Sequence, residues 1–313
     1  MSASPAPRPK VGVVTVNWNA AEDTLACLDS LAASQYPNLD IVVCDNASTD
    51  GSYERLRERT DATVLQAGAN LGWCGGVNLG AKFVLERGCD YLLILNNDTV
   101  LPPELIPAMV AVYEADPHAG LVTARERLFH DPVRGDRLGA RYRPLVCMVD
   151  WLFADEGNRE VLADPLPMEA VSCCGTMASR AAVEAVGVLD EAFFIYWEDV
   201  DWSLRVRAAG FQNYCVTGSM IVHKSGASLS DAPGLSLPQL YLVCRGQALI
   251  ARKHARGLAR LVAPARLLVS SLLTLLRGLV SPAQRPHMRT KLAAFRDGWF
   301  RRPVDMTRLQ RRS

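Results

Sequence analysis

Two short polar clusters in this sequence contain the side chains that metal binding and acid–base catalysis require. In Asn96-Asn97-Asp98, two polar side chains flank a third residue and can point together toward one metal ion or one ribose-diphosphate. A hard divalent cation prefers such oxygen ligands and often keeps substrate phosphates in its shell. The same residues equally suit an Asx-rich turn before the helix expected at Pro102.

The second cluster, Trp197–Trp202, contains Glu198, Asp199 and Asp201. Adjacent carboxylates repel each other, so one of them can have a raised pKa suited to general-base chemistry. Acidic residues are also favourable at a helix N-terminus. The two interpretations are compatible, because the start of a helix also fixes the position of a carboxylate.

His223 follows an apolar run and precedes Lys224 and Ser225. A single histidine is most often structural or exposed, although imidazole is also a common metal ligand. We therefore expect a metal role for His223 only if the fold brings it to Asp98.

The familiar nucleotide-binding motifs are missing. The sequence contains no GxxxxGK[ST] motif, and no GxGxxG follows the first expected strand, which ends in Asn17-Trp18-Asn19. Their absence argues against a P-loop protein and against a Rossmann dehydrogenase. Gly72, Gly75 and Gly76, taken alone, suit a tight turn better than a phosphate cradle.

The first half of the chain alternates between expected strands and helices. Strands are predicted at 11–16, 39–44, 62–66 and 91–95, and helices at 21–34, 52–59, from the loop 70–76 to 87, and 102–115. This alternation predicts a mostly parallel sheet covered on both faces. Ligands of such sheets bind beyond the carboxyl ends of the strands, which is where Asn17–Asn19, Asp45–Asp50 and Asn96–Asp98 fall.

The second half is less regular. Residues 120–167 show charges and turns without a clear period, and a strand is expected near Ala170–Cys174. Helices are expected at 179–186 and 201–209, and a strand at 214–222.

Composition and charge narrow the class of protein. The 313 residues are 49% hydrophobic and 21% charged, which is typical of a folded globular chain. Residues 1–10 lack the apolar core of a signal peptide. Nine scattered cysteines without a CxxC pair argue against a disulfide framework or structural zinc, and favour a cytoplasmic protein.

The net charge of +1 conceals an asymmetry. Residues 251–313 carry 15 Lys and Arg and two acids, so that segment is +13 and the preceding 250 residues are −12. Such a split often indicates an anionic partner. The apolar stretch 258–280 has only 267–276 free of charge, so we expect it not to span a bilayer. Two roles remain open for it: an interfacial helix on anionic lipid, or a hairpin that packs on the rest of the chain or on a dimer partner.

Five ordered segments resemble the glycosyltransferases of family 2, which have the GT-A fold, and within them the bacterial rhamnosyltransferase-like branch. The segments are Val14–Asn19, Asp45–Ser52, Asn70–Asn78, Leu95–Thr99 and Phe193–Trp202. The resemblance covers roughly residues 10–226, and the segment 241–254 with Arg245 and Lys253 often follows the catalytic domain in this branch. It implies a GT-A-type, Rossmann-like α/β fold with a mostly parallel sheet flanked by helices.

The resemblance also assigns roles to individual residues. Asp199 would be the catalytic base, and Asp98, His223 and Asn96 would bind Mg²⁺ or Mn²⁺. Asn96 replaces the first Asp of the family's DXD motif and removes one negative charge from the metal site. The implied nucleotide-binding residues are Thr15, Asn17, Asp45, Asn46, Gly75, Gly76, Asn78 and Asn97. In this group Asp45 would accept a hydrogen bond from the nucleobase of the donor. The implied acceptor-binding residues are Trp197, Glu198 and Gly175.

The implied activity is an inverting transfer of a sugar from a nucleotide-diphosphate donor, favoured as dTDP-L-rhamnose, to a hydroxyl group. The acceptor could be a glycan, a lipid-linked sugar or a small molecule. The alternatives are a UDP-hexose donor on the same fold, or a non-catalytic module that binds nucleotide sugars or glycans. No nucleic-acid partner is expected, and a homodimer remains open.

The expected organisation has three parts. Residues 1–9 form a disordered tail, residues 10–226 a catalytic domain, and residues 227–313 a basic helical extension. The catalytic domain divides into a nucleotide-binding half, 10–115, and an acceptor half, 116–226. We expect a cytoplasmic protein, and contact of 251–313 with anionic membrane on the inner face remains open beside packing on the chain itself or on a dimer partner.

Overall fold

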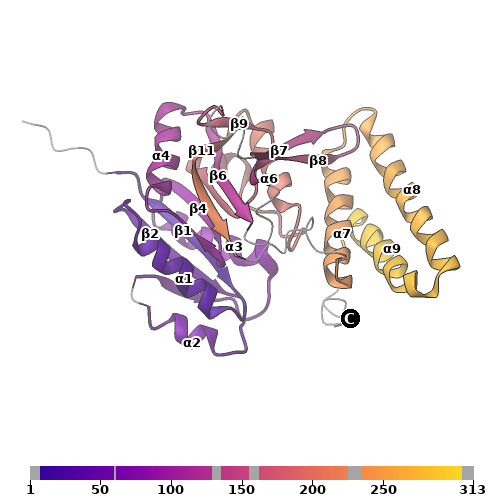
Figure 1. Ribbon diagram of the computed structural model, residues 1–313, viewed down its shortest axis with the longest axis horizontal. Helices are drawn as coiled ribbons and strands as arrows, with labels where there is room; N and C mark the ends of the chain where they lie inside the picture. The colour runs from indigo at the N-terminus through magenta and orange to yellow at the C-terminus, as the bar shows by residue number, and fades with distance from the viewer. Residues whose placement is uncertain (1–7, 60, 129–134, 155–161, 225–234, 305–313) are drawn as a thin grey trace, which may run out of the picture.

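The computed structural model describes residues 8–59, 61–128, 135–154, 162–224 and 235–304. A central sheet lies between helices, and further helices extend from one side of it (Figure 1). The strands are β1 (Val11–Asn17), β2 (Leu39–Asp45), β3 (Thr63–Gln66), β4 (Tyr91–Asn96), β5 (Thr99–Val100), β6 (Ala119–Leu128), β7 (Asp136–Arg143), β8 (Met148–Ala154), β9 (Leu166–Met168), β10 (Gly175–Ser179) and β11 (Gln212–His223).

The helices alternate with strands in the first half and gather at the C-terminus. They are α1 (Ala21–Ala32), α2 (Ser52–Leu56), α3 (Gly72–Glu86), α4 (Leu105–Ala115), α5 (Arg180–Val186), α6 (Glu198–Ala208), α7 (Leu237–His254), α8 (Ala259–Val280) and α9 (Arg285–Trp299), with the 3-10 turn η3 (Pro282–Gln284). The predicted tail, residues 1–9, and the predicted domain boundary after residue 226 fall mostly or wholly outside the described residues.

The sheet has the strand order β3-β2-β1-β4-β10-β6-β11-β5. Its first four strands are mutually parallel, β10 runs antiparallel to both β4 and β6, and β6 is parallel to β11. The predicted α/β fold with a mostly parallel sheet flanked by helices is confirmed.

Two details of the predicted second half were wrong. The expected strand at Ala170–Cys174 is a buried segment outside the regular strands, and β10 begins at Gly175. A short apolar run looks the same in a buried loop and in a buried strand. The stretch 120–167, expected to be irregular, contributes most of β6, β7, β8 and β9, because charged residues on a half-exposed hairpin hide the period of its strands.

Each face of the sheet has its own hydrophobic core. Leu92 and Ile94 of β4 pack in one core, and Leu93 and Leu95 pack in the other, because successive strand side chains point to opposite faces. Helices α1 and α4 cover the second core, while α3, α5, α6 and α7 cover the first. Burial on both faces explains why the strands are continuous apolar runs.

The carboxyl ends of β1, β2 and β4 meet at one edge of the sheet. Asn17 is paired in register with Asp45, and Val16 with Asn96, so the polar clusters after these strands become neighbours. Helix α3 begins at Gly72, so Gly75 and Gly76 are helical rather than part of a turn. A Cβ at Gly76 would lie 2.8 Å from Val16 Cγ1, so this glycine allows close packing of helix on strand.

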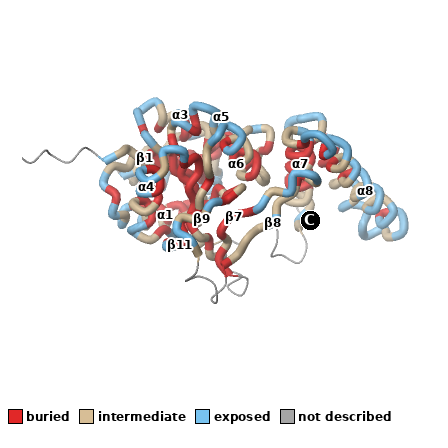
Figure 2. Tube along the Cα trace, turned by 90° about the horizontal axis from the view of Figure 1, so that it is seen from above, coloured by how far each residue is buried: buried red, intermediate tan, exposed pale blue. Residues whose placement is uncertain are grey.

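Helices α7, α8 and α9 form the part of the chain that we call the C-terminal extension, residues 235–304. Helix α7 packs against the α/β body, while α8 projects away from it (Figure 1 and Figure 2). Helix α8 is 22 residues long and, by length and composition alone, could cross a membrane. The expectation that this stretch does not span a bilayer stays a prediction, because length and composition alone do not decide whether a helix crosses a membrane.

Candidate active site

The fold brings His223 to Asp98, which was the condition for a metal role. His223 Nε2 lies 3.0 Å from Asp98 Oδ1 and 3.2 Å from Asn96 Nδ2. His223 and Asp98 come together because β11 pairs with β5, which places His223 opposite Thr99, the residue after Asp98. All three predicted metal ligands therefore lie together at the edge of the sheet.

Glu126 completes this cluster and was missed from the sequence. Its Oε1 lies 2.8 Å from His223 Nδ1, so the imidazole is held between two carboxylates. The ligand atoms of Glu126, Cys174 and His223 lie within 4.8 Å of one another. A signal existed, because Glu126 follows the apolar run 119–124, just as the other polar clusters follow strands.

The acidic neighbours control the charge of His223. Burial by itself lowers the pKa of this imidazole, but Cys174, Asp98 and Glu126 more than offset that effect and raise the pKa well above its usual range. The cluster thus stabilises positive charge at this position.

The donor set suits a divalent cation of the Mg²⁺ or Mn²⁺ type. Asp98, Asn96 and Glu126 offer oxygen atoms and His223 offers a ring nitrogen, a combination that Mn²⁺ accepts readily. Glu126 Oε2 is buried and accepts no hydrogen bond among the described atoms, although Arg137 Nη1 lies 3.4 Å away. The cluster is therefore a candidate metal centre.

The predicted base and its neighbour lie in the first turn of α6. The helix begins at Glu198, three residues earlier than expected, so Glu198 and Asp199 both meet the helix N-terminus. Asp199 Oδ1 accepts a hydrogen bond of 2.7 Å from the amide of Val200. Trp197, just before the helix, has a left-handed backbone with φ of 73°.

Burial changes the pKa of both carboxyl groups. It raises the pKa of Asp199 to about 6 and raises that of Glu198 well above its usual range, with the charge of Asp199 as the next cause for Glu198. Near neutral pH, Asp199 is therefore mostly ionised and can accept a proton, whereas the raised pKa of Glu198 favours its protonated form.

Asp199 and the candidate metal centre of Asn96, Asp98, Glu126 and His223 line one cavity of about 590 Å³. Its wall combines the polar end of the sheet, the loop before α6, the hairpin β7–β8 and one side of α7. The residues that line it include Asn96, Asn97, Asp98, Glu126, Arg137, Trp151, Trp197, Glu198, Asp199, His223 and Gln247. The arrangement can hold a cation and accept a proton within one cavity.

The predicted nucleotide-binding residues of β1 and β2 form a buried polar network. Asn17 Nδ2 donates to Asp45 Oδ1 at 2.8 Å, and Ser48 Oγ donates to the same oxygen at 2.6 Å. Asn46 Nδ2 donates to the carbonyl of Gly72 at 2.8 Å. Thr15 Oγ1 is buried and has no partner among the described atoms. The network fixes the polar ends of β1 and β2, although its residues are not among those that line the cavity.

The remaining predicted residues have different surroundings. Asn97, which lines the cavity, donates to Thr24 Oγ1 at 2.9 Å. Asn78 points instead to the loop before α6, where its amide bonds the backbone of Leu189 in both directions. Gly175 is buried in β10, and a Cβ there would lie 2.8 Å from Ile221 Cδ1, so its glycine character is explained by packing.

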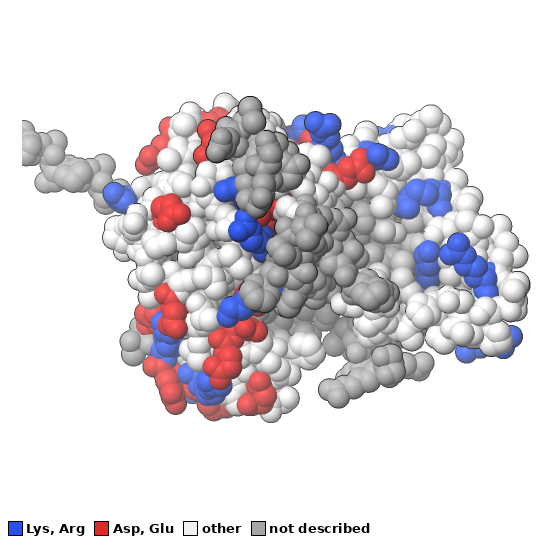
Figure 3. Space-filling view, viewed as in Figure 1, with Lys and Arg blue, Asp and Glu red and all other residues white. Residues whose placement is uncertain are grey.

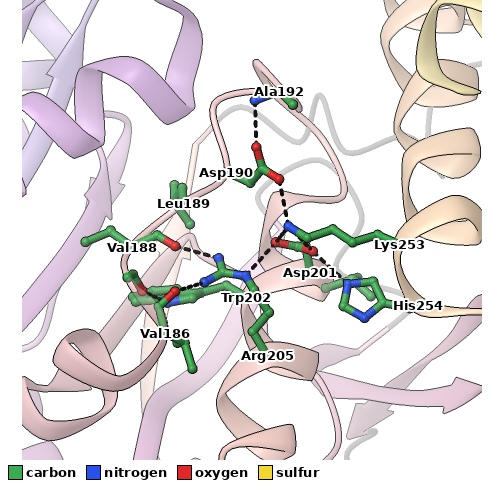
Figure 4. A network of polar contacts seen from close by, with 12 residues as sticks. Val186, Val188, Leu189, Asp190, Ala192, Asp201, Trp202, Arg205, Lys253 and His254 are labelled. Carbon is green, nitrogen blue, oxygen red and sulfur yellow. Dashed lines mark hydrogen bonds and ion pairs between the residues drawn. The ribbon is translucent and has the colours of Figure 1, made fainter. Parts of the chain in front are cut away.

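A polar network ties α7 to α6 and to the loop before it (Figure 4). Lys253 Nζ lies 2.7 Å from Asp190 Oδ2 and 2.9 Å from Asp201 Oδ2, and His254 Nε2 lies 2.7 Å from Asp201 Oδ1. Arg205 Nε donates to Asp201 Oδ2 at 2.8 Å. The extension therefore supports the segment that carries Asp199.

Helix α7 also contacts that segment directly. A Cβ at Gly246 would lie 2.7 Å from Trp197 Cδ1 and 2.9 Å from the carbonyl oxygen of Tyr196. Only glycine permits this approach of the helix to the loop.

The hairpin β7–β8 supplies a wall that sequence reasoning missed. Arg137 lies over the Trp151 ring at 4.8 Å and beside Glu126, and both Arg137 and Trp151 line the cavity. A flat indole beside a cation suits the face of a sugar near an anionic group.

The family model described as "Glycosyl transferase family 2" matches residues 12–187. The chain belongs to glycosyltransferase family 2. The match begins in β1 and ends just after α5, so it includes the carboxyl ends of β1, β2 and β4. The polar residues that follow these strands, including Asn96 and Asp98, therefore lie within the part of this family 2 glycosyltransferase that the family model matches.

Two relatives of this family 2 glycosyltransferase are rhamnosyltransferases. The dTDP-rhamnosyl transferase RfbF of Shigella flexneri is 25% identical over 77% of this chain and 79% of its own length. The N-acetylglucosaminyl-diphospho-decaprenol L-rhamnosyltransferase of Mycobacterium tuberculosis (strain CDC 1551 / Oshkosh) is 26% identical over 72% of this chain and 79% of its own.

Solved structures place the family 2 glycosyltransferase in the GT-A fold. GalNAc-T7, solved with UDP, GalNAc and Mn²⁺, superposes with a TM-score of 0.62 at 14% identity over 78% of this chain. The chain spans about half of GalNAc-T7, 47%. S. aureus TarS 1-349 in complex with UDP-GlcNAc gives a TM-score of 0.52 at 17% identity over 80% of this chain and 69% of that one. At these identities the likeness shows the fold.

Proposed function

We propose that this protein is an inverting glycosyltransferase that moves a sugar from a nucleotide-diphosphate donor to an acceptor hydroxyl group. The observation that carries the proposal is one cavity that contains both the half-buried carboxylate Asp199 and the Asn96, Asp98, Glu126 and His223 cluster. Inversion requires one base on the face opposite the leaving group, unlike the paired acid and base of glycosidases.

In this proposal Asp199 accepts the proton of the attacking hydroxyl group. Its raised pKa, about 6, makes it a better base than an ordinary aspartate while leaving it ionised at neutral pH. Protonated Glu198 and the Trp197 ring would orient the acceptor, since both line the cavity beside the base.

Asp98, His223, Glu126 and Asn96 would hold Mg²⁺ or Mn²⁺. Such a cation, when bound, acts as a Lewis acid that neutralises the developing charge of the departing diphosphate. The network of Asn17, Asp45 and Asn46, with Thr15 and Asn97, would bind the nucleotide at the same edge of the sheet. Gly76 would let α3 approach that edge closely, and Gly75 would leave room for the Leu71 side chain at the start of the helix. Asn78 would serve the site by holding the loop at Leu189.

The favoured donor is dTDP-L-rhamnose, supported by the names of the two relatives. The alternative is a UDP-hexose, because GalNAc-T7 and TarS were solved with UDP or a UDP-sugar. The acceptor would be a glycan or a lipid-linked sugar, lying against the wall that contains Trp151 and Arg137. All nine cysteines are free and buried, which supports a cytoplasmic location.

A donor panel tests the proposal. The protein with Mn²⁺ is mixed with dTDP-L-rhamnose, UDP-glucose or UDP-N-acetylglucosamine, and thermal unfolding is followed. A donor at about 100 times its dissociation constant adds roughly 2.7 kcal/mol to the free energy of unfolding. The donor that stabilises is then used for transfer to sugar acceptors, and the anomeric configuration of the product is read by NMR. Retention of configuration would contradict the inverting mechanism, and stabilisation without transfer to any acceptor would favour a binding module.

A further inference from the structure

The outer face of α8 exposes a continuous apolar surface. Large hydrophobic side chains on it are between 50% and 86% exposed, and they recur at helical spacing along 22 residues. We call this set the α8 face: Leu258, Leu261, Leu268, Val269, Leu272, Leu273, Leu276, Leu279 and Val280. Apolar patches of this kind on soluble proteins mark an interaction site.

The opposite face of α8 already has its partners. Ala259, Ala263 and Leu267 are buried in the core that α7 and α9 share, and Gly278 packs closely on Met288 of α9. One side of α8 is therefore buried against α7 and α9 and the other side is exposed, so the α8 face needs an external occupant.

The charges around the α8 face are positive. Arg260 and Arg277 lie exposed near its two ends, and Arg285 and Arg289 follow at the start of α9. Helix α8 contains no acidic residue, and in α9 the acid Asp297 is buried and paired with Arg296. Figure 3 shows the same pattern, with Lys and Arg on the visible surface of the extension and most visible Asp and Glu on the α/β body.

The positive charge distinguishes between two candidate occupants of the α8 face, a second copy of the chain and a lipid bilayer. A second copy of the chain, packed face to face through α8, would bring the two arginine-rich ends of each extension against like charges, which costs free energy. An anionic bilayer offers apolar chains to the leucines and phosphate groups to the arginines.

We infer that α8 lies in the interface of an anionic lipid bilayer, with the α8 face turned toward the acyl chains and the flanking arginines at the headgroups. Spanning is disfavoured, although α8 is long enough. Crossing would draw its packed partner α9, with Arg285, Arg289 and Lys291, into the hydrocarbon region, where charged side chains are costly.

Flotation with vesicles tests this inference on the full chain. The protein is mixed with vesicles of phosphatidylcholine containing phosphatidylglycerol, or of phosphatidylcholine alone, and the floating fraction is measured. We expect flotation with the anionic vesicles, much less with the neutral ones, and release of the protein by alkaline carbonate. The readout needs no sugar transfer, so its failure is distinguishable from failure of the proposed function.

Two variants separate the apolar and charged contributions. In Leu268→Ser/Leu272→Ser/Leu276→Ser, we expect binding to anionic vesicles to fall by about tenfold or more, because the apolar area that enters the interface is removed. Arg260→Gln/Arg277→Gln should lose the preference for anionic vesicles. The matched control is Phe300→Ser, an exposed apolar residue at the end of α9 rather than on the α8 face, and it should float as the wild type does.

Three results would overturn the inference. The first is wild-type protein that floats with neither vesicle and forms a dimer that the triple serine variant dissolves, which would assign the α8 face to a second copy. The second is flotation that resists alkaline carbonate, as expected of a spanning helix. The third is a triple serine variant that floats like the wild type while its thermal unfolding is unchanged.

Discussion

The ammonium group of Lys253 lies 2.9 Å from the carboxylate of Asp201, which is fully buried. Lys253 belongs to the C-terminal extension, whereas Asp201 lies two residues after the candidate base in α6. The extension is therefore part of the structure that positions Asp199, the candidate base.

Lys253→Met should lower both stability and transfer. The change leaves a buried carboxylate with one partner fewer, so we expect the free energy of unfolding to fall by about 1–3 kcal/mol. Urea unfolding measures the loss, and initial rates measure the effect on transfer. Lys82→Met is the matched control, because Lys82 is 75% exposed and lies 4.0 Å from Glu86; it should change stability by less than about 0.5 kcal/mol. Equal effects of the two substitutions would contradict the positioning role of Lys253.

Asp201→Asn should remove part of the acid sensitivity of the fold. Burial alone would raise the pKa of Asp201, but His254, Arg205 and Lys253 lower it to about 2. A carboxyl whose pKa is lower in the folded state stabilises the fold fully above its unfolded pKa, and this contribution is lost as pH falls toward 2. The shift corresponds to about 2 kcal/mol. Urea unfolding measured from pH 7 down to pH 3 should show that the difference in the free energy of unfolding between wild type and variant becomes smaller. A difference that stays constant over this range would exclude the linkage.

Asp199→Asn should abolish most of the turnover and leave donor affinity nearly unchanged. A positioned base contributes about 10²–10⁴-fold, so kcat should fall by that factor. Because the base must be ionised, wild-type kcat should decrease as pH falls through about 6, the raised pKa of Asp199. The residual rate of the variant should not decrease as pH falls through this range. Asp29→Asn, at an exposed acid, serves as the control and should keep both rate and pH profile.

Gly246→Ala should impair the site more than Gly278→Ala does. At Gly246 the new Cβ meets the carbonyl of Tyr196 and the Trp197 ring, neither of which can move without shifting the loop. At Gly278 it meets the flexible Met288 side chain, and alanine also favours a helix by up to ~1 kcal/mol. The acceptor KM should therefore rise for Gly246→Ala alone, as initial rates at varied acceptor will show.

Glu126→Gln should weaken cation binding. The substitution keeps the shape of the side chain and removes the negative charge 2.8 Å from His223. We expect Mn²⁺ to raise the unfolding temperature of the wild type, and chelation to lower its transfer rate, with both effects much reduced in the variant. Glu86→Gln, at an exposed position, is the control. If Mn²⁺ stabilised Glu126→Gln as strongly as the wild type, Glu126 would not be a ligand.

The sequence alone determined the local structure of residues 10–115. The runs that became β1, β2 and β4 are apolar because both faces of those strands are buried, and the polar residues after them, such as Asn17 and Asp45, mark the ends of the strands. Parallel pairing then requires these ends to meet, so Asn96 and Asp98 could be assigned to a site before any contact was known.

Only the tertiary structure decided which distant residues complete that site. Glu126 and His223 are 97 positions apart, and Lys253 lies 52 positions after Asp201. Such partners meet through the order of strands in the sheet and the packing of α7 on the body, and neither property has a local period in the sequence. The leucines of α8 had the pattern of an amphipathic helix, but which of them are exposed depends on where α7 and α9 pack. Burial is set by the neighbours that the fold supplies, and a residue's type records only its preference for them.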